Sequence, residues 1–123
     1  MCQTGRMGQL IKNASRIPVP GGKIIDEYVG RVNTGEERIS IAHMIAPPGW
    51  SEPPQTPSFH EYTLVLRGIV RVEHDGGVTD VGTGQAFVSE PGEKVRYSVG
   101  PDGAEYVAIC MPAFSPETAG REE

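Results

Sequence analysis

A proline-rich stretch that runs directly into a short apolar segment constrains this chain more than any other feature of its sequence. Prolines recur through residues 47–57, which excludes a helix or a central strand there because proline lacks a backbone N–H donor. Residues 62–66 read YTLVL, which is typical of a buried strand that ends at Arg67-Gly68. The order predicts a rigid loop that delivers polar side chains to the mouth of a buried strand.

The rest of the chain is rich in turn signals. Its 123 residues include sixteen glycines and eleven prolines, a composition that favours short strands over long helices. We expect eight or nine short strands and no convincing helix, which predicts an all-β sandwich or barrel. The clearest expected strands are 23–32, 38–46, 61–72, 78–81, 85–89, 94–99 and 105–111.

The length fits one compact domain with a single core. We predict a flexible N-terminal tail over residues 1–9, the β domain over residues 10–114, and a polar C-terminal tail over residues 115–123 with at most one helical turn. The turn at 100–103, Gly-Pro-Asp-Gly, is expected to be a loop between two separate strands.

Charge and cysteine usage narrow the classes of partner. The net charge of −5 and a pI near 5.2 argue against nucleic acid and against an anionic membrane. No segment resembles a signal peptide or a membrane-spanning helix. Cys2 and Cys110 lie at opposite ends of the sequence, so a structural disulfide is not expected and a reducing cytoplasm is the predicted location.

Two spaced frames resemble the sequence motifs of the cupin superfamily. The first family motif reads G-x5-H-x-H-x3,4-E-x6-G, and this chain keeps its spacing from Gly49 to Gly68, with Gln55, Pro57 and Glu61 at the ligand positions. The second motif reads G-x5-P-x-G-x2-H-x3-N. It is matched without a gap from Gly84 to Val99; the glycines are kept, but Glu90, Val95 and Val99 replace the proline, histidine and asparagine.

The resemblance implies a double-stranded β-helix, the jelly-roll-like cupin barrel, in a small single-domain protein that is a homodimer with its site inside the barrel mouth. The family's metal site uses three imidazoles and one carboxylate. Only Glu61 keeps a ligand type here, and an amide such as Gln55 binds transition metals poorly. No cofactor is therefore expected; a divalent iron, zinc or manganese ion is the disfavoured alternative.

Glu61 is the main candidate for catalysis. Strand alternation places it on the same face as Thr63 and Val65, where a carboxyl needs a partner or acquires a raised pKa. Such a group can act as a general acid or base. The alternative is a structural glutamate bonded to Gln55 or to a tyrosine.

Further site candidates lie on the loop and on the strands around it, with a packing or surface role as the alternative for each. His60 is a catalytic candidate only if the loop twists, because it should face away from its neighbour. Tyr97 is a catalytic candidate on the inward face of its strand. The candidate substrate-binding residues are Gln55, Glu52, His43, Arg96, Tyr106 and Trp50. Arg96 reaches the pocket only through a one-residue bulge.

Three functions remain open at this point. The first is a metal-independent isomerase, cyclase, lyase or dehydratase acting on a small oxygenated metabolite, with Glu61 moving a proton. The second is a metal-dependent, dioxygenase-like enzyme with a non-standard site. The third is a non-catalytic module that binds a small molecule. Fold alone does not decide among them.

Overall fold

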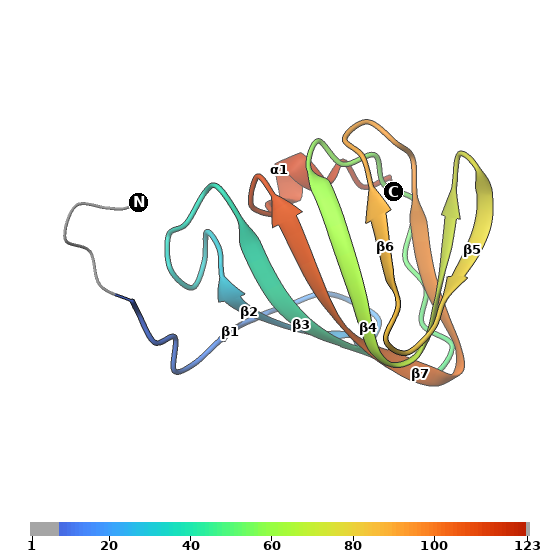
Figure 1. Ribbon diagram of the computed structural model, residues 1–123, viewed down its shortest axis with the longest axis horizontal. Helices are drawn as coiled ribbons and strands as arrows, with labels where there is room; N and C mark the ends of the chain where they lie inside the picture. Colours follow the sequence, from blue (N-terminus) through green and yellow to red (C-terminus); the bar gives the residue numbers. More distant parts are fainter. Residues whose placement is uncertain (1–7, 123) are drawn as a thin grey trace.

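The computed structural model describes residues 8–122, which form a curved antiparallel sheet of seven strands and one short helix (Figure 1). Residues 1–7, most of the predicted N-terminal tail, and Glu123 lie outside the described part. The elements are β1 (Ser15–Ile17), β2 (Ile24–Val29), β3 (Ser40–Ala46), β4 (His60–His74), β5 (Gly77–Val81), β6 (Ala86–Ser89), β7 (Arg96–Met111) and α1 (Pro116–Ala119).

The strands follow the order β1-β2-β3-β7-β4-β5, and β6 pairs with β4. The all-β prediction is therefore confirmed. Two expected strands, 94–99 and 105–111, are instead parts of one strand, β7, and the expected loop 100–103 lies within it. The strand predicted over 23–32 corresponds to β2, which pairs with β1 on one side and with β3 on the other.

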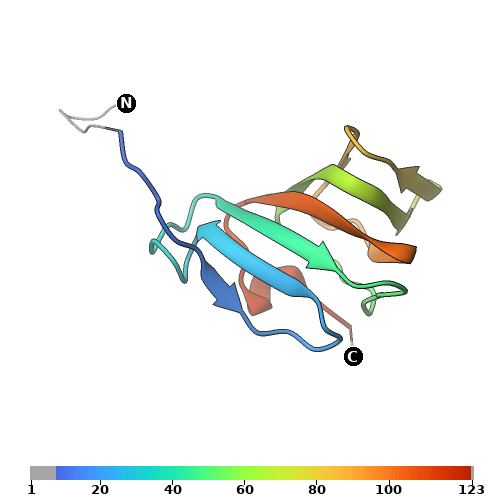
Figure 2. The ribbon, with the colours of Figure 1, turned by 90° about the horizontal axis from the view of Figure 1, so that it is seen from below.

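The long strands β4 and β7 pair along most of their length and bend together. Their register is continuous from His60–Met111 to Val65–Tyr106, shifts near Gly68, and resumes at Val70–Val99. At the bend Gly68 has φ 83°, and a Cβ there would clash with the backbone oxygen of Gly103. Glycine permits both the backbone angle and the close approach. The bend turns the sheet back on itself, so the same two strands line both sides of the interior (Figure 1). Figure 2 shows β1, β2, β3, β7 and β4 side by side in this order.

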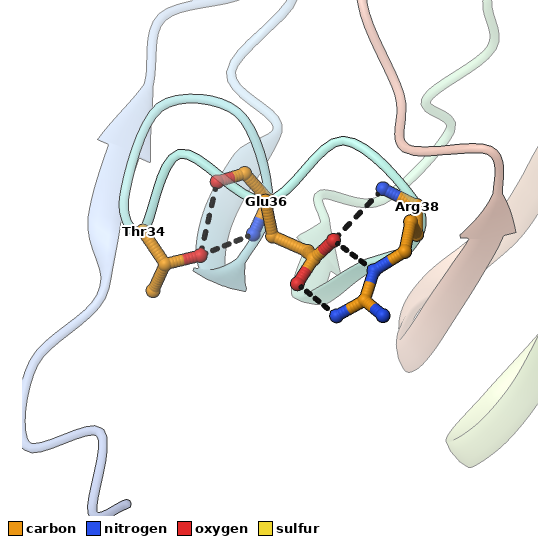
Figure 3. A network of polar contacts seen from close by, with 4 residues as sticks. Thr34, Glu36 and Arg38 are labelled. Carbon is orange, nitrogen blue, oxygen red and sulfur yellow. Dashed lines mark hydrogen bonds and ion pairs between the residues drawn. The ribbon is translucent and has the colours of Figure 1, made fainter. Parts of the chain in front are cut away.

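The connection from β2 to β3 is held by local side-chain contacts (Figure 3). The Thr34 hydroxyl accepts a hydrogen bond from the Gly30 N–H and donates one to the Gly30 carbonyl, each at 3.1 Å. Glu36 accepts two hydrogen bonds from the Arg38 guanidinium, at 2.8 and 3.0 Å. Inside the turn, the buried Glu27 carboxylate accepts backbone N–H groups at 2.9 and 3.0 Å. The chain thus turns over residues 31–34 between the two strands.

The proline-rich loop runs beside the first half of β7. The Val99 N–H donates to the Trp50 carbonyl at 2.9 Å, and Gln55 exchanges two backbone hydrogen bonds of 2.9 Å with Val95. The loop is therefore tied to a strand at two points and carries its polar side chains to fixed positions. The structure thus has an irregular loop over residues 47–57, where the prolines predict one.

The barrel interior is filled by alternating strand residues. Its largest cluster contains Trp50, Val65, Val70, Val72, Val95, Tyr97, Val99 and Tyr106, all at most 8% exposed. Thr63 and Val65 share the inward face with Glu61, and Val95, Tyr97 and Val99 also point inward. The predicted alternation holds on both strands because no bulge interrupts these stretches.

The C-terminal segment, predicted as a polar tail, packs against the proline-rich loop in its described part. Ser115 caps α1 by accepting the Thr118 N–H at 3.1 Å. The Gly120 carbonyl accepts the Thr56 N–H at 2.9 Å, and Ala119 is 2% exposed. The helix lies beside the end of β7 (Figure 1). Across residues 8–122, no helix has the length and apolarity needed to cross a bilayer.

Candidate functional site

An enclosed cavity lies inside the barrel, between the sheet, the proline-rich loop and the C-terminal segment. Its volume is about 50 Å³, and a neighbouring space of about 120 Å³, here called the vestibule, has Trp50 in its wall. Both spaces are lined by three charged side chains: Lys23, Glu52 and Arg121. Such an enclosed space suits a small molecule rather than a polymer.

Glu61 lies within this cavity at the start of β4. Its side chain is buried, and its Oε1 accepts a hydrogen bond of 3.3 Å from the Tyr97 hydroxyl. Burial raises the pKa of Glu61 to about 7, and the negative charge of Glu52 adds to the rise; Lys23 and the Tyr97 hydrogen bond oppose it. A carboxyl with this pKa exchanges its proton readily near neutral pH.

The tyrosines of the cavity are hydrogen-bond donors rather than bases. Burial raises the pKa of Tyr97 well above its usual value, and the charge of Glu61 raises it further. Burial likewise raises the pKa of Tyr106. Both phenols therefore stay protonated at neutral pH and can stabilise negative charge on a carboxylate or on a ligand oxygen.

The loop supplies two polar atoms that have no hydrogen-bond partner within residues 8–122. Oε2 of Glu52 and Oε1 of Gln55 are buried and accept no hydrogen bond from this described part of the chain. Burial raises the pKa of Glu52, although Lys23 and Arg121 oppose the rise. Buried polar atoms without partners are costly unless a ligand or water satisfies them. Their presence marks the cavity as a place for a polar ligand.

Lys23 precedes β2 and places its ammonium against aromatic rings. Its Nζ lies 4.1 Å from the centroid of Trp50 and 5.2 Å from that of Tyr106. Burial lowers the pKa of Lys23 to about 8; the charges of Glu52 and Glu61 oppose this shift, whereas Arg121 adds to it. The aromatic faces stabilise the cationic form, so Lys23 is mostly cationic at neutral pH, but with a larger neutral fraction than an ordinary lysine.

Arg121, near the C-terminal end of the chain, lines the cavity together with Lys23. Its guanidinium NH2 lies 4.0 Å from Oε1 of Glu52, and its backbone forms a bridge with that of Gln55. The side chain is 37% exposed, so it stands at the mouth of the cavity. The cavity is thus closed by a segment that the sequence predicts to be a tail.

The structure brings most of the predicted site residues together. The residues that line the cavity or its vestibule are Gln55, Glu52, Glu61, Tyr97, Tyr106 and Trp50. Sequence reasoning missed Lys23 and Arg121, because Lys23 is the first residue of a predicted strand and Arg121 is part of a predicted polar tail. Only their pairing with distant segments places them in the cavity.

Three predicted site residues lie outside the cavity, which corrects their placement. His60 faces away from Glu61, as alternation requires, and its Nε2 lies 3.2 Å from Oε1 of Glu90. On β3, His43 points outward, where its Nε2 lies 2.6 Å from Oε2 of Glu105.

Arg96 also lies outside the cavity, because no bulge turns its side chain inward. Its NH1 bonds to Glu73 at 3.0 Å, and its Nε donates to the Glu52 carbonyl at 3.0 Å. Arg96 therefore supports the backbone of the loop from behind and does not reach a ligand in the cavity.

The donor set of the cavity does not fit a transition metal. At the positions of the family's ligands stand Gln55, Pro57, Glu61 and Val95, and within residues 8–122 no three His, Cys, Asp or Glu side chains are grouped so as to hold an ion. The cationic Lys23 also occupies the neighbourhood of the two carboxylates. Divalent iron, manganese and zinc prefer several imidazole or carboxylate ligands, which this cavity does not offer.

The sequence profile of the AraC-like ligand binding domain matches residues 40–121, two thirds of the chain. The chain belongs to this family. The family is of cupin type, so this small cupin is the superfamily member that its two motif frames indicate. The matched range includes the loop, β4, β7 and Arg121, and therefore most of the cavity wall.

The chain is also similar to part of a longer protein that is named as an endoribonuclease. The endoribonuclease YbeY of Myxococcus xanthus (strain DK1622) is 38% identical over 116 residues, which cover 94% of this chain. This AraC-like ligand binding domain spans only 40% of that relative's length. The relative's name therefore describes a much longer protein.

Solved structures of two other proteins share the fold. A variant of oxalate decarboxylase from Bacillus subtilis superimposes with a TM-score of 0.78 and 19% identity, over 98% of this chain and 33% of that one. KdgF from Halomonas sp. gives a TM-score of 0.70 with 14% identity, over 81% of this chain and 89% of its own. The decarboxylase is described with Mn(II) centres. At these identities the likeness establishes the cupin barrel, a double-stranded β-helix.

Proposed function

We propose that this cupin is an enzyme that moves a proton on a small oxygenated metabolite without a metal, as an isomerase, cyclase, lyase or dehydratase does. One observation carries the proposal: a buried glutamate with a pKa near 7 lies inside a small cavity and accepts a hydrogen bond from a tyrosine. A general acid or base works best when its pKa is near the working pH. We place the enzyme in the cytoplasm, as its cysteine usage suggests.

The roles of the cavity residues follow from their chemistry. Glu61 takes a proton from one substrate atom and returns it to another. The Tyr97 phenol holds the carboxyl in place and donates to developing negative charge. Oε2 of Glu52 and Oε1 of Gln55 accept hydrogen bonds from substrate hydroxyl groups, which satisfies both atoms. Arg121 at the mouth attracts an anionic group.

Proton exchange with solvent tests this proposal before the natural substrate is known. The protein is incubated in D₂O with a panel of small oxo acids, hydroxy acids and lactones, and each C–H signal is followed by proton NMR. We expect deuterium to replace one substrate proton with the wild-type protein, and Glu61→Gln to slow this by roughly two to four orders of magnitude. Exchange that is equally fast with Glu61→Gln would refute the role of Glu61.

The second candidate is a non-catalytic module that binds a small molecule, and the family match favours it. The same panel of compounds distinguishes the binding module from the enzyme. A compound whose signals broaden or shift on binding to the wild-type protein, with no deuterium uptake over hours, supports the binding module. The endoribonuclease name of the longer relative is not transferred, because this chain spans too little of that protein.

A further inference from the structure

Lys23 has properties that the proposed proton transfer leaves unused. It lines both the inner cavity and the vestibule, so a molecule entering from either space meets its amine. The Nζ lies 4.1 Å from the centre of the Trp50 ring, which belongs to the wall of the vestibule. A lysine held inside a ligand cavity, rather than extended into solvent, is a candidate nucleophile.

The amine is not held in a direct ion pair. Among the ion pairs of residues 8–122, every one with a separation of 4.0 Å or less involves another cation; Glu52, for example, pairs with Arg121. Glu52 and Glu61 act on Lys23 only through space. A buried lysine that served the fold alone would be expected to pair closely with a carboxylate. Lys23 instead lies against aromatic faces, which leave its lone pair available once the proton is lost.

We propose that the Lys23 amine forms an imine with a small aldehyde or 2-oxo acid inside this cavity. The amine nitrogen attacks the carbonyl carbon, a C–N bond forms, and the electron pair of the C=O bond moves to oxygen, which takes up a proton. The nitrogen then loses its protons, the oxygen leaves as water, and a C=N bond results. No oxidant or reductant is needed, because one amine and one carbonyl give one imine and one water.

The surroundings of Lys23 provide what this condensation requires. With a pKa of about 8, roughly a tenth of the amine is neutral at pH 7, compared with less than about a thousandth for an ordinary lysine. Glu61, with its pKa near 7, can give a proton to the departing oxygen and receive one from nitrogen. Arg121 at the mouth supplies a cation for the carboxylate of a 2-oxo acid.

The inference rests on the proposed function only in that a small oxygenated molecule enters the cavity. It does not require Glu61 to act on any C–H bond. A failure of the deuterium exchange experiment therefore leaves imine formation standing, and a failure of imine formation leaves the proton transfer standing.

Reductive trapping with glyoxylate tests the proposal on the unaltered protein. Glyoxylate is added at pH 7 with sodium cyanoborohydride, which reduces an imine to a stable secondary amine, and the modified lysines are mapped by peptide mass spectrometry. The chain has two other lysines, Lys12 and Lys94, which serve as internal controls. We expect Lys23 to be modified at least about tenfold faster than either. Equal rates at the three lysines, or no adduct on Lys23, would refute the proposal.

A pair of variants checks the assignment. Lys23→Arg keeps the positive charge but cannot form the imine, and Lys12→Arg is the matched control. We expect the first to abolish the fast phase of trapping and the second to leave it unchanged, with melting curves confirming that both are folded. A fast phase that persists in folded Lys23→Arg would place the reactive amine elsewhere. If Lys23→Arg does not fold, the peptide map of the wild-type protein decides alone.

Discussion

Tyr97 and Glu61 meet across the interior of the barrel although their backbones pair with other residues. In the β4–β7 ladder Glu61 lies opposite Cys110, and Tyr97 lies opposite Val72. Their side chains nevertheless bond at 3.3 Å, because the bend at Gly68 turns one half of the two strands to face the other. The hydrogen bond between Glu61 and Tyr97 thus depends on the curvature of the sheet.

The raised pKa of Glu61 predicts how stability depends on pH. The folded state holds the proton up to about pH 7, whereas the unfolded chain releases it near 4.5. Between these values the folded state binds more protons, so its free energy of unfolding falls as pH rises. Glu61→Gln should remove this fall and make the variant more stable than wild type at pH 8 by about 1–3 kcal/mol. Denaturant unfolding of both proteins at pH 4 and pH 8 measures this difference in the free energy of unfolding. A variant that is less stable than wild type at both pH values would indicate a structural glutamate.

Tyr97→Phe should raise the pKa of Glu61 further. The Tyr97 hydroxyl donates to the carboxylate and thereby lowers its pKa, so its removal shifts the titration to higher pH. The carboxyl carbon of Glu61, observed by carbon NMR in a labelled protein, reports the midpoint. Tyr28→Phe is the control, since Tyr28 is exposed on β2 and should not move that midpoint. An unchanged midpoint in Tyr97→Phe would mean that the hydrogen bond contributes nothing.

Gly120→Ala should loosen the segment that closes the cavity. Gly120 has φ 59°, and a Cβ there would clash with the Thr56 carbonyl oxygen. We expect a loss of about 1–3 kcal/mol in stability and faster amide exchange in residues 115–122. Gly35→Ala is the matched control: Gly35 also has a positive φ, but no atom lies within 4 Å of its Cβ position. Equal amide exchange in the two variants would show that the closure does not depend on Gly120.

The protein should purify with well under one equivalent of transition metal. The motif positions that carry histidine in metal-binding cupins carry Gln55, Pro57 and Val95 here, so only Glu61 remains as a strong ligand. Elemental analysis of protein purified without added metal measures this. Near-stoichiometric iron, zinc or manganese that survives dialysis against a chelator would overturn the prediction and favour the dioxygenase-like alternative.

We propose a homodimer formed through an outer apolar face, which consists of Tyr62, Leu64, Leu66, Val88 and Met111. Each of these side chains is between 37% and 48% exposed, and Tyr62 pairs with Val88 in register, so the residues share one surface of the sheet. Contiguous apolar residues on a sheet face are typical of a protein interface. The second copy buries the same face, as a two-fold axis requires.

Light scattering measures the mass. We expect a dimer for the wild type and a monomer for Leu64→Lys, with Val78→Lys as a control at another exposed apolar position. A monomeric wild type at micromolar concentration would contradict the proposal.

Much of the fold and part of the site follow from local sequence. The prolines of residues 47–57 exclude regular structure there, and alternation in residues 61–65 and 95–99 determines which side chains point inward. Glu61 and Tyr97 are therefore predictable as inward-facing, and His60 as outward-facing. These properties depend on the two-residue period of a strand and on backbone donors, which every short segment carries by itself.

Only the tertiary structure decided which distant groups share the cavity. Lys23 and Arg121 lie 98 positions apart in the sequence, and both reach Glu52 through the packing of separate segments. No local pattern distinguishes them from surface cations, and the same is true of the outward-facing Arg96. Burial shifts the pKa values of Glu61 and Lys23, and the charge of each residue opposes the shift of the other. The sequence by itself thus determined the barrel and its inward-facing carboxyl, whereas the chemistry of the cavity depends on long-range contacts that only folding creates.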